Sequence, residues 1–258
     1  MASFLSWLFL YKKYNILLNN STLVKKSVIL FSKNKSILQL TIIYFVVVVA
    51  CSLVKQNNYP NFSFFLSSIR IPILIVLYYI SSTVKSTLYF SALILFFFAF
   101  LFFREITSVS NLIGSVISLI YRLIIFLIVY KSIKNKNWIA ITLASIPYVF
   151  SYLYIVFLIE HEINFDFYPW VFNGFLTAFI GGIATYDYFF KDEKKSFWLF
   201  ISAILFTIQI GVFLINKYYI SEEILKTTTI ILFGISNFTF YKYVIITEEK
   251  NKLKDPAN

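Results

Sequence analysis

Two arginines lie inside long apolar segments, where a charged side chain is costly to place. Arg122 is the twelfth residue of the apolar block 111–131, and Arg70 is the ninth residue of the block 62–83. A charge at the middle of a bilayer costs about 2.5–3.5 kcal/mol to insert, so such a residue is a candidate for function. A guanidinium keeps its charge and binds anionic oxygens with several N–H donors. Arg122 therefore predicts an anchor for an anionic headgroup in a polar cavity.

A structural role for Arg122 is the alternative. Gln209, Ser236 and Asn237 lie near the middle of the last two apolar blocks, and each could accept an interhelical hydrogen bond from it. No acidic residue lies at the middle of any block. Asp187, the nearest candidate for an ion pair, lies about one turn from the end of its block. The sequence is compatible with both roles.

Arg70 also has two interpretations. Pro72 follows it and removes a backbone hydrogen bond from the helix. If the helix begins near Ser67, Arg70 lies at the outer interface beside lipid phosphates. If the helix begins earlier, Arg70 lies inside the bundle and joins Arg122 as a ligand-binding candidate.

Few other residues could do chemistry. His161, the single histidine, stands between Glu160 and Glu162, with Asp166 nearby. Sequence neighbours on a helix point to different sides, so this is a weak metal-ligand set and fits a wet interfacial loop. The single cysteine, Cys51, excludes an intramolecular disulfide and a multi-cysteine metal site. Without a nucleophile motif, phosphate loop or zinc helix, the sequence predicts no catalytic residue, no metal and no cofactor.

The elements that must position these residues are eight apolar blocks of 18 to 23 residues, separated by short charged gaps. A helix of about 20 residues crosses a ~30 Å hydrocarbon core. The sequence thus predicts an all-α, polytopic membrane bundle of about eight helices. The blocks are 37–54, 62–83, 86–103, 111–131, 138–159, 168–190, 196–216 and 224–246. They make one membrane domain (37–246), between a basic N-terminal segment (1–36) that could form an interfacial helix and a short tail (247–258).

Positive charge is distributed unevenly between the gaps. The net charge is +11, and most lysines fall in segments on one side of the predicted bundle. The gaps on the other side hold only Lys55, Arg104 and Lys217. Because cytoplasmic segments are enriched in Lys and Arg, this pattern predicts that both termini are cytoplasmic, as in a multi-pass protein of a bacterial inner membrane. The lysines form no cluster with exposed aromatics, so the lipid bilayer and not nucleic acid is the expected partner.

The block 168–190 carries small residues at a spacing of four, namely Gly174, Ala178 and Gly182. Such a face lets two helix backbones approach closely in lipid. Packing within one bundle is the favoured interpretation, and homodimerisation is the alternative. The sequence does not decide the oligomeric state.

Three stretches resemble the YhhN-like lysoplasmalogenases, a family of multi-pass membrane proteins. Ser68–Tyr79, with a basic residue and a proline near its start, is similar to the second span of that family. Ala92–Phe103 is similar to the third, and Ser202–Gly211 to a Gly-Ala-x-Leu-Phe-x-x-Ser-Asp segment. The likeness covers about residues 62–246 and implies an eight-span scaffold with a lipid-facing cavity. The activity that it implies is hydrolysis of the vinyl-ether bond of lysoplasmalogen.

The polar residues of the family are replaced in this chain. Ala99-Phe100 stands where the family has Gly-Asp, Tyr121-Arg122 where it has Ala-His, and Gln209-Ile210 where it has Ser-Asp. Vinyl-ether hydrolysis needs positioned acid–base groups, and arginine stays protonated.

These replacements favour a lysoplasmalogenase-like protein that binds a single-chain lipid, such as a lysolipid, without cleaving it. One alternative is a hydrolase that uses other groups, such as Asp187 or the Glu160–Glu162 cluster. A small transporter is a further alternative, although no internal repeat typical of transporter folds is recognisable.

Overall fold

The computed structural model describes residues 34–54, 60–104, 107–133, 137–162, 166–191 and 193–254. The chain divides into two units, Met1–Ile42 and Ile43–Asn258. In the first unit, the described residues 34–42 are helical and belong to the helix Asn34–Val54. The predicted interfacial helix near the N-terminus lies outside the described residues.

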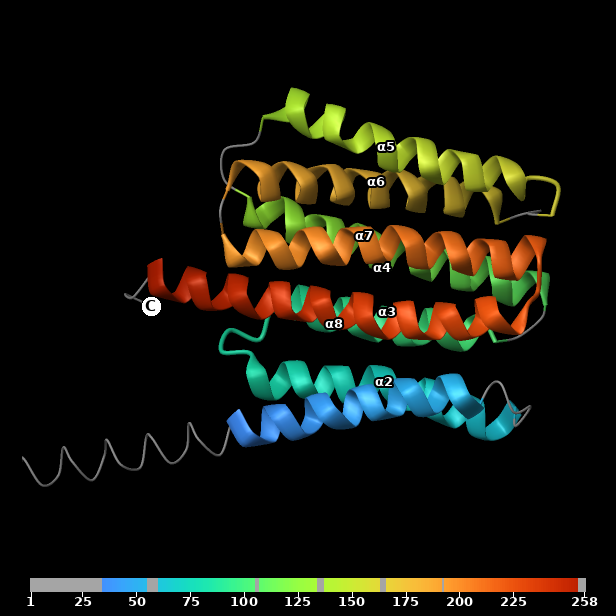
Figure 1. The fold of residues 1–258 in the computed structure, drawn as a ribbon, viewed down its shortest axis with the longest axis horizontal. Helices are drawn as coiled ribbons and strands as arrows, with labels where there is room; N and C mark the ends of the chain where they lie inside the picture. Colours follow the sequence, from blue (N-terminus) through green and yellow to red (C-terminus); the bar gives the residue numbers. More distant parts are fainter. Residues whose placement is uncertain are drawn as a thin grey trace, which may run out of the picture. The chain divides into compact units, whose positions relative to one another are not determined.

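The second unit is an all-α bundle, and no strand occurs in its described ranges. Figure 1 shows its labelled helices running roughly parallel or antiparallel to one another. Each predicted apolar block corresponds to a helix, and most boundaries agree within a few residues. The labelled helices are α2 (Pro60–Ser81), α3 (Thr87–Phe102), α4 (Ser108–Ser132), α5 (Trp138–Leu158), α6 (Phe167–Phe190), α7 (Lys194–Leu214) and α8 (Glu223–Lys254), with a π-helical turn η1 (Ile215–Tyr219) between the last two.

Seven helices of the described chain are long and apolar enough to cross a membrane, so this is a multi-pass membrane protein. The exception is α3, which has 16 residues. At 1.5 Å per residue it spans about 24 Å, less than a ~30 Å hydrocarbon core. The block 86–103 predicted a longer element. The chain instead turns at Phe103: the Phe103 N–H donates to the Ala99 carbonyl, and the Arg104 N–H donates to the Leu101 carbonyl in a tightened last turn.

Local sequence explains where several helices begin. Proline is favoured at the first helical position, where its missing N–H costs no hydrogen bond, and Pro60 begins α2. The Thr107 side chain caps α4 by accepting from the Ser110 N–H, and Asn137 caps α5 by accepting from the Ala140 N–H. These polar residues thus stop the apolar runs from merging into longer helices.

Sequence neighbours pack against each other from α2 to α4 and from α5 to α8, whereas α4 packs on α6 and not mainly on α5; further contacts join α5 to α7 and α2 to α8. The small-residue face of α6 lies against α5. Gly174 contacts the ring of Tyr152, and Gly182 contacts Ser145 and the Ile141 carbonyl, so an added Cβ would collide at either position. Ala178 is buried on the same helix. At these two glycines, α6 therefore lies close against a helix of the same chain.

Candidate ligand-binding site

A cavity of about 610 Å³ lies between α2, α3, α4, α6, α7 and α8. This volume is within the range of small-molecule sites, about 300–1,000 Å³. Aromatic side chains make much of its wall, and four basic residues but one acidic residue line it within the described chain. The basic ones are Arg70, Arg104, Arg122 and Lys226, and the acidic one is Glu223.

Four residues of the lining lie at or near the ends of their helices, and we call this end of the cavity the mouth; they are Arg104, Asn216, Glu223 and Lys226. Arg104 and Glu223 are exposed, and the other two are partly exposed. All four lie at helix ends or in the adjoining turns. Solvent therefore reaches the charged groups of the mouth.

The opposite end is closed, and Arg122 lies there with Tyr121 and Phe206. All three are nearly inaccessible to solvent, and Arg122 is only 3% exposed. The guanidinium lies 4.6 Å from the Phe206 ring centroid and 5.4 Å from that of Tyr121. Its Nε and Nη1 atoms have no hydrogen-bond partner within the described part of the chain. Stacking on aromatic faces therefore holds Arg122, but no carboxylate neutralises it there.

Arg70 lies between the two ends and is buried, not at the lipid interface. The helix begins at Pro60, seven residues before the start that the interfacial interpretation required. The side chain is 4% exposed. Its Nε donates to the Ser67 carbonyl and its Nη1 to the Ile230 carbonyl, each at 3.2 Å. Backbone oxygens thus fix the guanidinium, but they carry no full charge to offset its own.

A column of stacked aromatic rings separates the two buried arginines. The Phe233 and Phe96 ring centroids are 4.4 Å apart, and those of Phe96 and Tyr121 are 4.8 Å apart. Arg70 lies 5.4 Å from the Phe233 ring at one end of this column. The cavity therefore offers two cationic positions along an aromatic wall. Sequence reasoning did not identify this wall, because aromatic residues occur throughout the chain.

The structure brings together three of the five predicted ligand-binding residues. Gln209 lines the cavity with Arg70 and Arg122, whereas Ser236 and Asn237 do not. The Asn237 Oδ1 accepts from the Tyr121 hydroxyl at 3.2 Å, so this amide lies behind the cavity wall. The Ser236 hydroxyl donates to a carbonyl of its own helix. Neither side chain is therefore positioned to meet a ligand in the cavity.

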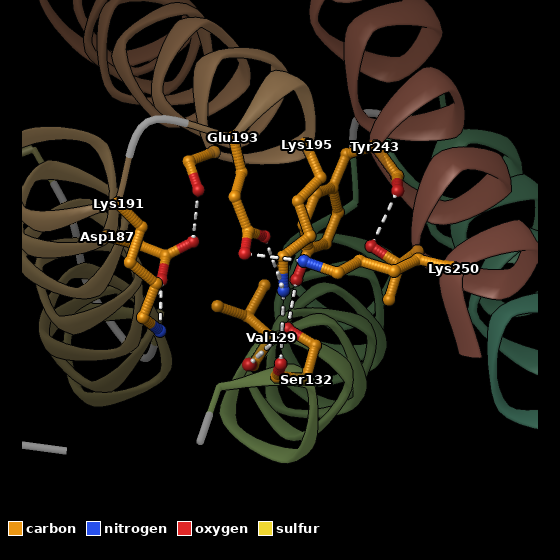
Figure 2. A network of polar contacts seen from close by, with 10 residues as sticks. Val129, Ser132, Asp187, Lys191, Glu193, Lys195, Tyr243 and Lys250 are labelled. Carbon is orange, nitrogen blue, oxygen red and sulfur yellow. Dashed lines mark hydrogen bonds and ion pairs between the residues drawn. The ribbon is translucent and has the colours of Figure 1, made fainter. Parts of the chain in front are cut away.

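The end of the bundle away from the mouth carries a polar network, which we call the inner network. Figure 2 shows Asp187, Lys191, Glu193, Lys195 and Lys250 there, contributed by α6, α7, α8 and the turn between α6 and α7. Asp187 accepts from the Lys191 Nζ at 2.7 Å and from the Ser196 hydroxyl at 2.6 Å. Its side chain is fully buried. Asp187 is therefore committed to packing at this end and does not line the cavity.

Glu193 joins α8 to the same network. Its carboxylate lies 2.5 Å from the Lys250 Nζ and 3.7 Å from the Lys195 Nζ. The hydrogen bond from Lys250 is the main cause of a lowered pKa for Glu193. Below it, Ser132 and Tyr243 share a hydrogen bond between their hydroxyl groups, visible in Figure 2. Each carboxylate named here thus has a basic partner.

The other acidic candidates are also away from the cavity. Glu160, His161 and Glu162 lie exposed in the turn after α5. In the described ranges no group of three His, Cys, Asp or Glu residues could hold a metal ion. The hydrolase alternative based on Asp187 or the Glu160–Glu162 cluster therefore has no residue at the cavity.

Comparison of the chain with protein-family models gives no match, and comparison with curated proteins and with solved structures gives none either. None of these comparisons bears on the resemblance to the lysoplasmalogenase-like family, which rests on three short stretches of the sequence.

Proposed function

We propose that this protein binds an anionic single-chain lipid in the cavity, on a lysoplasmalogenase-like scaffold that has lost the hydrolytic groups. The observation that carries the proposal is Arg122, a buried cation with no carboxylate partner in the described residues, lining a cavity large enough for a ligand. An unneutralised charge in low dielectric is strongly unfavourable. A bound anion removes that penalty.

The chemistry of the wall suits an amphiphile better than a small inorganic anion. A guanidinium binds carboxylate or phosphate oxygens through its fork of N–H donors. The rings of Phe96, Phe100, Phe206 and Phe213 offer an apolar surface for an alkyl chain. A phosphate ion alone would leave that surface in contact with water, whereas a lipid chain covers it.

The places in the fold of the residues compared with the family support the proposal of a lysoplasmalogenase-like scaffold. Each of the three pairs that replace polar residues of the family lines this one cavity, although the pairs come from α3, α4 and α7. The pairs are Ala99-Phe100, Tyr121-Arg122 and Gln209-Ile210. Positions that are far apart in the sequence thus converge on one cavity, as a shared site requires.

The position of the cavity's carboxylate favours binding over hydrolysis. Cleavage of a vinyl ether needs a proton donor close to the bond. Glu223, the one carboxylate among the described lining residues, is exposed at the mouth, at the far end from Arg122. A substrate held by Arg122 would therefore meet phenylalanine and isoleucine where the family has acids.

Binding to the purified protein in mild detergent tests the proposal, with oleate and lysophosphatidylglycerol as anionic probes and monooleoylglycerol as the uncharged comparator. We expect saturable binding of both anions and a weaker interaction with the neutral lipid. The Arg122→Gln substitution removes a charge-assisted contact worth about 1.5–3 kcal/mol and should weaken anion binding about 10- to 100-fold. Arg122→Lys keeps the charge and should retain part of the affinity.

The matched control is Lys242→Gln, which removes one positive charge from a membrane helix at a residue that does not line the cavity. Its affinity should equal that of the wild type. Equal anion affinity in Arg122→Gln and the wild type, with both proteins folded, contradicts the proposal. Release of aldehyde from lysoplasmalogen by the wild-type protein contradicts the loss of hydrolysis.

A further inference from the structure

The two ends of the cavity differ in how their charges are satisfied. At the mouth, Arg104 is exposed and stacks on Phe64 with a distance of 3.6 Å from Cζ to the ring centroid. Lys226 and Glu223 lie beside it with opposite charges and with access to solvent. Water can hydrate all three groups. The Arg122 guanidinium, at the closed end, has neither exposure nor a carboxylate.

We infer that the lipid binds head-inward, with its anionic group at Arg122 and its chain directed to the mouth. This orientation rests on the proposed function and specifies how the ligand is held. It is the reverse of a lipid in a bilayer leaflet, whose headgroup stays at the water interface. The ligand must therefore leave the leaflet and enter the cavity headgroup first.

The reverse orientation is unfavourable for two physical reasons. A chain pushed to the closed end would place methylene groups against the buried guanidinium, which would then remain without a counter-charge. The anionic group would meanwhile lie among the groups of the mouth, which are exposed and gain little from a second partner. Head-inward binding instead adds the anion where the protein has no partner for its own cation.

The length of the cavity leaves room for an alkyl chain between the headgroup and the mouth. Phe206, which contacts Arg122, and Asn216, at the mouth, are ten residues apart along α7 and η1. At 1.5 Å per residue, this corresponds to about 15 Å along the axis. A headgroup occupies only a part of that length. The remainder is lined by the rings of Phe100, Phe213 and Trp170, which suit an alkyl chain.

Trp170 provides a natural reporter of the orientation. It is the fourth residue of α6, lines the cavity, and stacks on Phe103 with ring centroids 5.9 Å apart. It also lies beside Phe213, with ring centroids 5.7 Å apart. Phe213 is seven residues nearer to the mouth than Phe206, or about 10 Å along the helix. Head-inward binding therefore brings the chain, and not the headgroup, to Trp170.

The test uses fatty acids whose extended chain is about as long as the roughly 10 Å between the levels of Phe206 and Phe213. They are brominated near the carboxylate or at the methyl end, because bromine quenches tryptophan fluorescence at contact distance. The full chain carries Trp7→Phe, Trp138→Phe and Trp198→Phe, which leave Trp170 as the single emitter. We expect several-fold stronger quenching of Trp170 by the methyl-end label. A second protein with Phe206→Trp and Trp170→Phe reports from the closed end and should show the opposite preference.

Saturable binding with equal quenching by the two labels, or with stronger quenching of Trp170 by the carboxyl-end label, overturns the head-inward orientation but leaves the proposed function standing. Absence of saturable binding to the Trp170 protein, when it retains the thermal unfolding of the wild type, overturns the proposed function and the orientation with it. Arg122→Gln in the Trp170 background should lose the preference together with the affinity.

Discussion

The cavity and the inner network use positive charge in opposite ways. At the inner network, Lys191 pairs with Asp187, and Lys250 pairs with Glu193. In the cavity, Arg122 is more deeply buried than either lysine and has no carboxylate partner in the described chain. The inner network therefore pairs Asp187 and Glu193 with lysines, whereas the cavity leaves the charge of Arg122 unneutralised.

This difference separates charges that stabilise the fold from charges that are available to a ligand. A carboxylate bonded on two sides holds helix ends together, and its loss leaves donors without an acceptor. A buried cation without a counter-charge keeps an uncompensated desolvation cost in the ligand-free protein, so such a group is retained against a free-energy cost. Substitutions at the two ends should therefore change stability in opposite directions.

The largest effect is expected at the inner network, from Asp187→Ala. The change removes the acceptor of the Ser196 hydroxyl and of the Lys191 ammonium, and hydrogen bonds to a charged group contribute about 1.5–3 kcal/mol. We expect a loss of about 2–3 kcal/mol in the free energy of unfolding, measured in mild detergent. Glu160→Ala, at an exposed acid, is the control and should change little. A loss no larger than that of this control would remove the distinction between the two ends.

The second effect has the opposite sign and comes from Arg122→Met. Replacing a buried ion pair by apolar residues of similar volume is often stabilising, by about 1–4 kcal/mol, and a buried charge without a carboxylate partner has no ion-pair energy to lose. We expect the ligand-free variant to be more stable than the wild type by about 1 kcal/mol. Oleate should raise the melting temperature of the wild type, as a ligand that binds only the folded state does, and not that of the variant. Destabilisation comparable to that of Asp187→Ala would make Arg122 a structural residue.

Much of this fold could be predicted from hydropathy. An apolar run must form a helix in lipid because every backbone N–H and C=O needs a partner, so the blocks coincide with the helices. The deep charges Arg70 and Arg122 were recognisable because their insertion cost depends on depth alone. Depth is a property that sequence position encodes directly.

The direction in which a side chain points was harder to predict. Lys226, Thr229, Ile230 and Phe233 line the cavity along one face of α8. Asn237 is one turn beyond Phe233, so helical spacing places it on the same face, near the predicted depth. The Tyr121 ring lies in between, since its hydroxyl donates to Asn237. A contact between α4 and α8 thus decides the extent of the cavity, and hydropathy carries no information about such contacts.

The inner network was missed for a related reason. The number of lysines at this end predicted that it is cytoplasmic. A count of lysines does not say which carboxylates they bind. Glu193 and Lys250 are 57 positions apart, and they meet because α7 and α8 pack together. Only the packing of the helices reveals that these charges are paired.

A smaller effect is expected from Tyr243→Phe within the inner network. Tyr243 is fully buried, and its hydroxyl shares a hydrogen bond with that of Ser132. A neutral hydrogen bond contributes about 0.5–1.5 kcal/mol, so we expect a loss of about 1 kcal/mol in the free energy of unfolding. Tyr154→Phe removes a hydroxyl from a side chain that is largely exposed, and it should leave the unfolding free energy unchanged. Equal effects of the two changes would mean that the Ser132 contact adds nothing.

The smallest effect concerns pH and separates the two ends once more. The pKa of Glu193 is lowered below its ordinary value of 4.5, chiefly by the hydrogen bond from Lys250. A carboxyl with a lowered pKa in the folded state stabilises the protein above its unfolded pKa, and this stability is lost as the pH falls through the folded pKa. Because both side chains of the pair are partly exposed to solvent, the contribution is about 0.2–1 kcal/mol.

Unfolding measured from neutral pH to below pH 4.5 should therefore show a shallower acid-side loss in Glu193→Gln than in the wild type. Lys250→Gln should reproduce that shallower slope, since it removes the other half of the pair. Arg122→Met should keep the wild-type slope, because no carboxylate of the described chain pairs with Arg122. A slope that changes with Arg122 as much as with Glu193 would mean that the cavity cation is coupled to an acid after all. Arg122 would then already be paired within the folded protein and would not be available to an anionic ligand.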